Sequence, residues 1–159
     1  MTDHMSHITR QMVRPRPGHR HIFAYDNLMD EAAIGGRCPD PHFVTTARYL
    51  SRRLIFNSDG VATIVPRRDF VVHGVIWEIS KIGQVGLDIQ LGVPSVFHRI
   101  GAFARGPVGE LVISEFYAAR NHRHGDANQG LLLEMMQLAS LRSFPKEYLD
   151  ELAGWRRCP

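Results

Sequence analysis

The stretch from Phe70 to Arg99 reads FVVHGVIWEISKIGQVGLDIQLGVPSVFHR. Its first ten residues are mostly β-branched or aromatic and are apolar at both odd and even positions, which is typical of a strand covered on both faces. Gly74 marks a place in that strand where a neighbouring segment packs closely. Ser80 predicts the N-cap of a short helix that ends at the Gly-Val-Pro sequence of residues 92–94, and a second strand is expected over 96–103. The apolar positions of the helix are Ile82, Val85 and Leu87.

The same stretch carries a family resemblance. The residues concerned are Val72, Gly74, Val75, Trp77, Glu78 and Ile79 in the strand, Leu87, Asp88, Gly92, Val93 and Pro94 in and after the helix, and then Phe97 and Arg99. They resemble the γ-glutamylcyclotransferases (AIG2-like proteins), in which a V-x-G-V-L-Y-E-L strand precedes a helix ending L-D-x-x-E-G-V-P and then an aromatic-x-Arg. Where that family places its catalytic glutamate, before Gly-Val-Pro, this chain has Leu91.

A second part of the resemblance lies at the end of the first predicted strand, HIFAY at residues 21–25. The family reads F-A-Y-G-S-N-L/M at this place, and its loop presents backbone N–H groups to the carboxylate of the substrate, as backbone nests do. Phe23, Ala24, Tyr25 and Met29 match the family. The Gly, Ser and Asn of the family are replaced here by Asp26, Asn27 and Leu28.

The resemblance extends in order over about residues 21–153 and implies the architecture of the family. That architecture is α+β, a small mixed β-barrel with short helices packed around it. The remaining strands are expected over 43–50, 53–57, 61–66 and 110–118, and the helices over 30–34, over 131–141 and from Pro145 onward. Residues 1–18 are polar and without apolar periodicity, so we expect a disordered N-terminal arm followed by a single domain over 19–156.

Composition narrows the class of protein. The 159 residues are 44% hydrophobic, which is enough for a core, and the formal net charge is +3. The excess of arginine sits at the two ends of the chain, where a solvated tail is the common interpretation, so we do not expect nucleic-acid binding. Cys38 and Cys158 are expected to be reduced thiols, and there is no membrane-length apolar run and no signal-peptide core. We therefore expect a cytoplasmic protein with a small-molecule substrate or ligand and no membrane partner; the oligomeric state stays open.

The reaction of the resembled family is an intramolecular aminolysis, in which the α-amino group of a γ-glutamyl compound attacks its own γ-carbonyl to give 5-oxoproline and a released amine. The reaction needs a base for the ammonium proton and donors for the α-carboxylate and the oxyanion. Leu91 cannot carry a proton, and Asp26 adds a negative charge where a carboxylate would dock. Phe97 also lacks the hydroxyl of the tyrosine that is usual in the family.

The residues that remain at the expected site have both catalytic and ordinary interpretations. Asp26 is a relocated acid or base, or a loop aspartate that accepts backbone hydrogen bonds. Glu115, which shares a strand face with Tyr117, is a substitute base or a solvated glutamate. We expect no metal site and no cofactor, because the sequence has no Gly-rich phosphate loop or nucleophile elbow and its histidine clusters lie in loops. The expected substrate-binding residues are Tyr25, Asp26, Asn27, Leu28, Leu91, Phe97 and Tyr117.

Three functions follow from these alternatives. The first is a cyclotransferase-like enzyme of the lyase type diverted to a small amine or amide, with Asp26 as the leading candidate for acid–base chemistry. The second is a catalytically inactive relative that binds a ligand or a protein. The third is a true γ-glutamyl cyclotransferase that uses Glu115 as its base. An open cavity with converging polar groups favours the first, and a cavity filled by side chains such as Leu91 and Phe97 favours the second.

Overall fold

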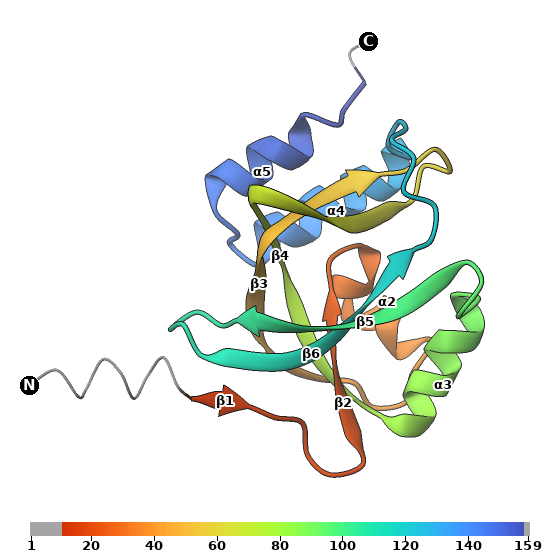
Figure 1. Cartoon of the computed structure of the whole chain (residues 1–159), viewed down its shortest axis with the longest axis vertical. Coiled ribbons are helices and arrows are strands. Elements are labelled where there is room, and N and C mark those ends of the chain that lie inside the picture. The colour runs from red at the N-terminus through yellow and green to blue at the C-terminus, as the bar shows by residue number, and fades with distance from the viewer. Residues whose placement is uncertain (1–10, 158–159) are drawn as a thin grey trace, which may run out of the picture.

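The strands of the chain form a mixed sheet that closes into a barrel in a computed structural model, which describes residues 11–157 (Figure 1). The strand order is β1-β6-β2-β4-β3-β5, and β5 pairs again with β6 to close the barrel. β6 runs parallel to β1 and β2, whereas the other pairs are antiparallel. The strands are β1 (Met12–Val13), β2 (His19–Ala24), β3 (His42–Phe56), β4 (Ala62–Ser80), β5 (Phe97–Arg105) and β6 (Leu111–Ala119). This arrangement confirms the predicted small mixed barrel.

Short helices surround the barrel and cover its two ends. α4 and α5 lie together at one end, and α3 lies at the other (Figure 1). The helices are the 3-10 turn η1 (Asn27–Met29), α2 (Glu31–Gly35), α3 (Lys81–Gln90), α4 (Gln129–Leu141) and α5 (Lys146–Ala153). Within residues 11–157, no helix combines the length and the apolar character that crossing a bilayer requires.

β4 is the central strand, because it pairs with β2 on one side and with β3 on the other. Its residues from 74 to 79 are buried, as the apolar run at both parities predicted. A Cβ atom at Gly74 would lie only 2.4 Å from the carbonyl oxygen of Ala24, which confirms the expected close approach of a neighbouring segment. The indole Nε1 of Trp77 donates to the carbonyl oxygen of Leu28 at 2.9 Å, and this bond holds the loop after β2 against β4.

The long strands join segments that were predicted as separate. The strands expected over 43–50 and 53–57 form the two halves of β3, and those expected over 61–66 and 70–79 form β4. Ser51 has a φ of 56° at the place where the pairing register shifts, so the chain bends there without ending the strand.

α3 begins as predicted but exposes more of its apolar residues than expected. The hydroxyl of Ser80 accepts the N–H of Gly83 at 3.0 Å, which makes Ser80 the N-cap. Leu87 is fully buried, whereas Ile82 and Val85 are 78% and 56% exposed. The helix therefore packs on the barrel through the face that carries Gly83 and Leu87 and leaves an apolar face uncovered.

The predicted disordered arm over 1–18 is only partly described, because residues 1–10 lie outside the described part of the chain. For the rest of the arm the expectation was wrong. Met12 and Val13 form β1 and pair in parallel with β6. The guanidinium of Arg16 forms an ion pair with the largely buried carboxylate of Glu78. This part of the chain is ordered because it adds an edge strand and covers a buried charge, neither of which depends on apolar periodicity.

Candidate active site

The loop after β2 is organised by the side chain of Asp26. Its carboxylate accepts the backbone N–H of Leu28 at 3.0 Å and so caps the turn η1. This N–H belongs to the loop that resembles the carboxylate-binding loop of the cyclotransferases. Asp26 therefore occupies at least one of the donors that such a loop would offer to an anionic ligand.

The protonation of Asp26 is set by its half-buried position. Burial raises the pKa of the carboxyl, while hydrogen bonds from the backbone N–H groups of Leu28 and of Asp26 itself and the charge of Arg37 lower it. The effect of burial is the largest, so the pKa of Asp26 lies above its ordinary value.

Leu91 forms the C-cap of α3 and packs against the barrel core. Its backbone N–H donates to the carbonyl oxygen of Leu87 at 2.9 Å, and its half-buried side chain joins the hydrophobic core. The same side chain lines an inner cavity at the end of β2. The residues that line this cavity are Ile22, Phe23, Ala24, Tyr25, Asp26, Leu28, Leu91, Phe97 and Tyr117.

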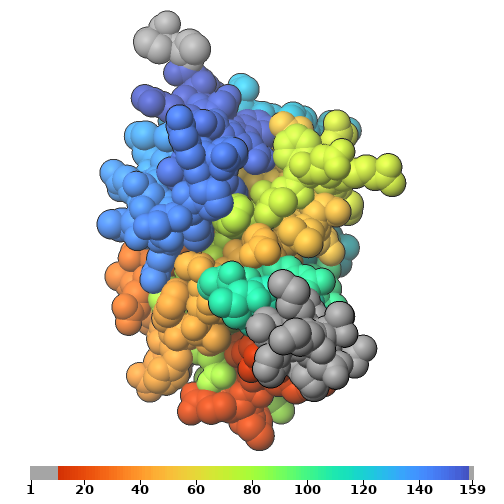
Figure 2. All heavy atoms as spheres, turned by 90° about the vertical axis from the view of Figure 1, so that its left-hand side faces the viewer, coloured from red at the N-terminus to blue at the C-terminus, as the bar shows by residue number. Residues whose placement is uncertain are grey.

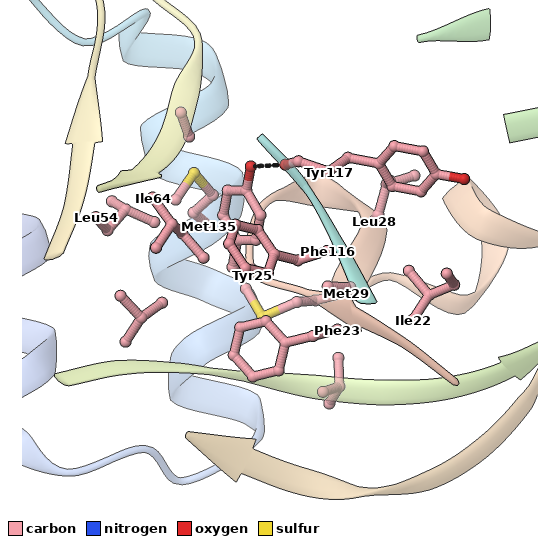
Figure 3. Close-up of a cluster of buried hydrophobic side chains, with 14 of the residues drawn as sticks. Ile22, Phe23, Tyr25, Leu28, Met29, Leu54, Ile64, Phe116, Tyr117 and Met135 are labelled. Carbon is pink, nitrogen blue, oxygen red and sulfur yellow. Dashed lines mark hydrogen bonds between the residues drawn. The ribbon is translucent and has the colours of Figure 1, made fainter. Parts of the chain in front are cut away.

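This inner cavity is almost filled by side chains. Its volume is about 10 Å³, which is close to the minimum that one water molecule needs. The ring of Tyr25 lies among the apolar side chains of the core, and its hydroxyl donates to the backbone carbonyl of Tyr117 (Figure 3). The ring of Tyr117 points away from Tyr25 in the same view. In this conformation the inner cavity has no room for an amino-acid-sized ligand.

The hydroxyl of Tyr117 belongs to a network of polar side chains from α3, β5 and β6. It donates to the carboxylate of Asp88 at 2.7 Å, and Arg99 approaches the same carboxylate at 3.4 Å. Arg99 also lies 3.3 Å from the carboxylate of Glu115, which accepts a hydrogen bond from Gln84 at 2.9 Å. Burial and the bond to Asp88 raise the pKa of Tyr117, so this hydroxyl stays protonated and acts as a donor at neutral pH.

An open groove, which we call the outer groove, adjoins the inner cavity, and Phe97 lines both. The groove has a volume of about 440 Å³, within the range of small-molecule sites. Its polar wall is pre-arranged, because the amide of Asn121 donates to Asp59 at 2.9 Å and to Ser58 at 2.8 Å. The residues that line the groove are Asn57, Asp59, Val61, Ser95, Val96, Phe97, Ala119, Arg120 and Asn121.

Solved structures with the same architecture include a gamma-glutamyl cyclotransferase, which matches with a TM-score of 0.80 and 24% sequence identity over 88% of this chain and 89% of its own. An uncharacterized protein from Homo sapiens matches with the same TM-score and identity over 89% and 90%. This chain has the γ-glutamylcyclotransferase-like fold. A gamma-glutamyl cyclotransferase specific to glutathione, from yeast, also shares the fold, with a TM-score of 0.59 and 13% identity over 86% and 95%. No protein-family model and no curated protein sequence matches the chain.

Within this cyclotransferase-like fold, the structure brings most of the predicted site residues together. Tyr25, Asp26, Leu28, Leu91, Phe97 and Tyr117 all line the inner cavity. Asn27 does not, because it lines a different hollow beside α4. Glu115 also lies outside the cavity lining and is held by Arg99 and Gln84.

Two polar residues near the site were not among those predicted from the sequence. Asp88 and Arg99 hold the hydroxyl of Tyr117 and the carboxylate of Glu115 in one network. Both stand among the positions that match the family motif, and this was the signal that could have identified them. In the part of the chain that the structure describes, no group of three or more His, Cys, Asp or Glu side chains is arranged to hold a metal ion.

Proposed function

We propose that this chain is a lyase-type enzyme that acts on a small amine-bearing amide, with Asp26 as the group that accepts and returns a proton. The observation that carries the proposal is the half-buried Asp26 carboxyl in the wall of the inner cavity, with a pKa above its ordinary value. A general base works best when its pKa lies near the working pH, and burial moves Asp26 in that direction. Among residues 11–157, Asp26 is the one carboxylate that lines this cavity.

The reaction that fits this arrangement is an intramolecular aminolysis. The carboxylate of Asp26 takes a proton from the ammonium group of the substrate, and the free amine attacks an amide carbonyl in the same molecule. A C–N bond forms to close a lactam, the original amide C–N bond breaks, and the proton returns to the leaving nitrogen. The hydroxyl of Tyr117 donates its one proton to Asp88, so it would have to leave Asp88 to stabilise developing negative charge on the substrate.

The charge of Asp26 selects the class of substrate. A free carboxylate on the substrate would lie a few ångströms from Asp26 and would be repelled by roughly 1–4 kcal/mol in partly aqueous surroundings. An amine without a neighbouring carboxylate would be attracted instead. We therefore infer a substrate without the α-carboxylate of γ-glutamyl compounds, bound in the outer groove, with Phe97 turning aside to admit the reacting group.

The test is a turnover assay with amino-amides that carry no carboxylate, alongside γ-glutamyl amino acids, glutathione and γ-glutamylamines. Release of amine and formation of lactam from the first group are expected, with Asp26→Asn reducing the rate at least about 100-fold, the lower range for loss of a general base. Glu115→Gln is the matched control and keeps the rate within a few-fold. Formation of 5-oxoproline that depends on Glu115 would replace this proposal by a true γ-glutamyl cyclotransferase with Glu115 as base.

A second candidate, a catalytically inactive binding or interaction module, is favoured by a separate observation. Side chains fill the inner cavity and leave a volume of only about 10 Å³, and the carboxylate of Asp26 accepts the hydrogen bond from the N–H of Leu28. Phe97→Ala distinguishes the two candidates, because it joins the outer groove to the inner cavity. Faster turnover or tighter amine binding in this variant supports the enzyme. Failure of both the parent protein and Phe97→Ala to bind any amine at millimolar concentration supports the inactive module.

The cytoplasmic location expected from the sequence stays a prediction.

A further inference from the structure

A further hollow lies where β3, the β5–β6 hairpin and the turn between α4 and α5 meet. Figure 2 shows this face, on which the orange atoms of β3, the green-to-teal atoms of the hairpin and the blue atoms of the α4–α5 region adjoin. The hollow has a volume of about 160 Å³, more than ten times what a single water molecule needs. It shares no lining residue with the inner cavity or the outer groove, so it is separate from the proposed active site.

The charges that line this hollow are all positive. Arg48 from β3, Arg105 from the end of β5 and Arg142 from the end of α4 line it, and all three are half-buried. Among residues 11–157, none of the three forms an ion pair with a carboxylate. Three guanidinium groups around one hollow repel one another, and an anion between them would remove that repulsion.

Each arginine is held in place by a neutral partner and so keeps its charge available. Arg48 donates to the carbonyl oxygen of Gly106 at 3.1 Å, and Arg105 donates to that of Gly109 at 3.2 Å. The guanidinium of Arg142 lies 4.3 Å from the centre of the Phe43 ring. A guanidinium has five N–H donors, and these contacts leave most of them free. The side chains are therefore positioned in advance, which lowers the entropic cost of binding.

The neighbouring groups limit where an anion fits. His73 lines the hollow, and burial together with the charge of Arg48 lowers its pKa to about 4, so the ring is neutral at pH 7 and carries one N–H group. Beyond His73 lies another hollow, lined by Asp69, Glu147 and Glu151, which would repel an anion. Outside the lining, the carboxylate of Glu110 lies against Gly106 and accepts the N–H of Val108 at 3.3 Å.

We propose that the hollow formed by Arg48, Arg105 and Arg142 binds the phosphoryl group of a small soluble phosphorylated molecule. Arginine matches the oxygens of a phosphoryl group with paired, charge-assisted hydrogen bonds, and several arginines share a tetrahedral dianion better than a planar monoanion. Pro145, the N-cap of α5, also lines the hollow, and the helix dipole there adds to the positive potential. The three arginines gather around one hollow of about 160 Å³, which distinguishes it from an extended basic stripe that would follow a nucleic acid.

The test is calorimetric titration of the full chain with inorganic phosphate and with glycerol phosphate, compared with chloride at equal ionic strength. Saturable 1:1 binding of both phosphates is expected, and the NMR resonances of the His73 ring should shift with the same midpoint. Arg142→Gln should weaken binding roughly tenfold or more, which corresponds to losing about 1.4 kcal/mol or more. Arg67→Ala is the matched control, because it removes an exposed positive charge away from the hollow and should leave the affinity unchanged.

Arg142→Lys tests the same point in a variant that retains the charge. It should still bind phosphate, more weakly than the parent, and its thermal unfolding should match that of the parent. Equal weakening by Arg142→Gln and Arg67→Ala would show diffuse attraction and overturn the proposal. Absence of saturable binding, or binding only to vesicles that contain phosphatidic acid and not to glycerol phosphate, would overturn it as well. Turnover of amino-amides is measured separately, so failure of this site and failure of the proposed activity are distinguishable.

Discussion

Replacing Leu91 by glutamate tests the geometry on which the site depends. Leu91 lines the inner cavity together with Asp26, and the remaining side chains of that lining are mostly apolar. Leu91→Glu therefore places a second carboxyl group in a nearly filled cavity that already contains one with a raised pKa. The two groups cannot both ionise freely, so the pKa of the pair should rise further. Leu91→Gln has the same size and no charge, and is the control.

The size of the effect follows from burial and linkage. Both variants lose about 1 kcal/mol of apolar burial, because Leu91 is only half-buried. A rise of about 1–2 units in the pKa of the added carboxyl costs Leu91→Glu a further ~1.4–2.7 kcal/mol at pH 7. For a chain of this length this corresponds to a melting temperature about 3–11 °C below that of Leu91→Gln.

The pH dependence gives the sign of the effect. A carboxyl whose pKa is higher in the folded state than in the unfolded state destabilises the protein as pH rises through that interval. The difference between Leu91→Glu and Leu91→Gln should therefore be largest at pH 7 and nearly absent at about pH 4, near the ordinary pKa of glutamate. Differential scanning fluorimetry of the two variants at both pH values measures it. Equal melting temperatures at pH 7 would mean that position 91 faces solvent, and the assignment of the site would be wrong.

Three further substitutions or reactions test the fold around the site. Burial raises the pKa of Glu78, but the hydrogen bonds and charge of Arg16 and the charge of His21 bring it below its ordinary value. Arg16→Ala should therefore lower the free energy of unfolding by about 1 kcal/mol at pH 7 and by less as the pH falls below about 4, because Glu78 is then protonated. Urea unfolding at the two pH values measures this difference. Gly74→Ala should cost at least about 2 kcal/mol in the same measurement, because the added Cβ would lie 2.4 Å from the carbonyl oxygen of Ala24; an unchanged midpoint would contradict the packing of β2 on β4. Burial raises the pKa of Cys38 to about 11, so peptide mass spectrometry should find it unmodified by iodoacetamide at pH 8 in the native protein and modified in urea.

The barrel could be predicted because its central strand leaves a clear pattern. Residues 70–79 are apolar at both parities, and β4 is paired on both sides and buried. The roles of Gly74 and Ser80 were also predictable, because each depends on local structure. Gly74 allows a neighbouring segment to approach closely, and Ser80 caps the N-terminus of α3. β1 could not be predicted, because a two-residue strand is specified by the edge of β6 that it meets and not by its own sequence.

The orientation of α3 could not be predicted, because the helix carries apolar residues on more than one face. Gly83 and Leu87 face the barrel, while Ile82, Val85 and Ile89 are exposed at 78%, 56% and 75%. The choice between the faces depends on the small residue Gly83, which allows close packing. Hydrophobicity alone would have favoured the opposite face.

That six of the expected residues surround one cavity was predictable, but whether the cavity is open was not. The retained motif around Leu91 and the loop after β2 were enough to place six of the expected residues around one cavity. Whether that cavity is open depends on how the rings of Tyr25 and Phe97 pack, and packing of this kind is set by the whole core. The same limit applies to Glu115, whose partners Gln84 and Arg99 come from two other elements.

The two differences from the resembled motif, at positions 26 and 91, are physically linked. A glutamate at position 91 and an aspartate at position 26 would place two carboxylates on the wall of one small cavity, at a cost of roughly 1–4 kcal/mol even with partial access to water. With leucine at 91, Asp26 is the single carboxyl on that wall in the described part of the chain, and the N–H of Leu28 stabilises it there. Placing glutamate at position 91 should therefore be tolerated better when Asp26 is replaced by glycine. The double variant should be more stable at pH 7 than the sum of the single substitutions predicts, and a double-mutant cycle with additive free energies would show that the two positions do not interact.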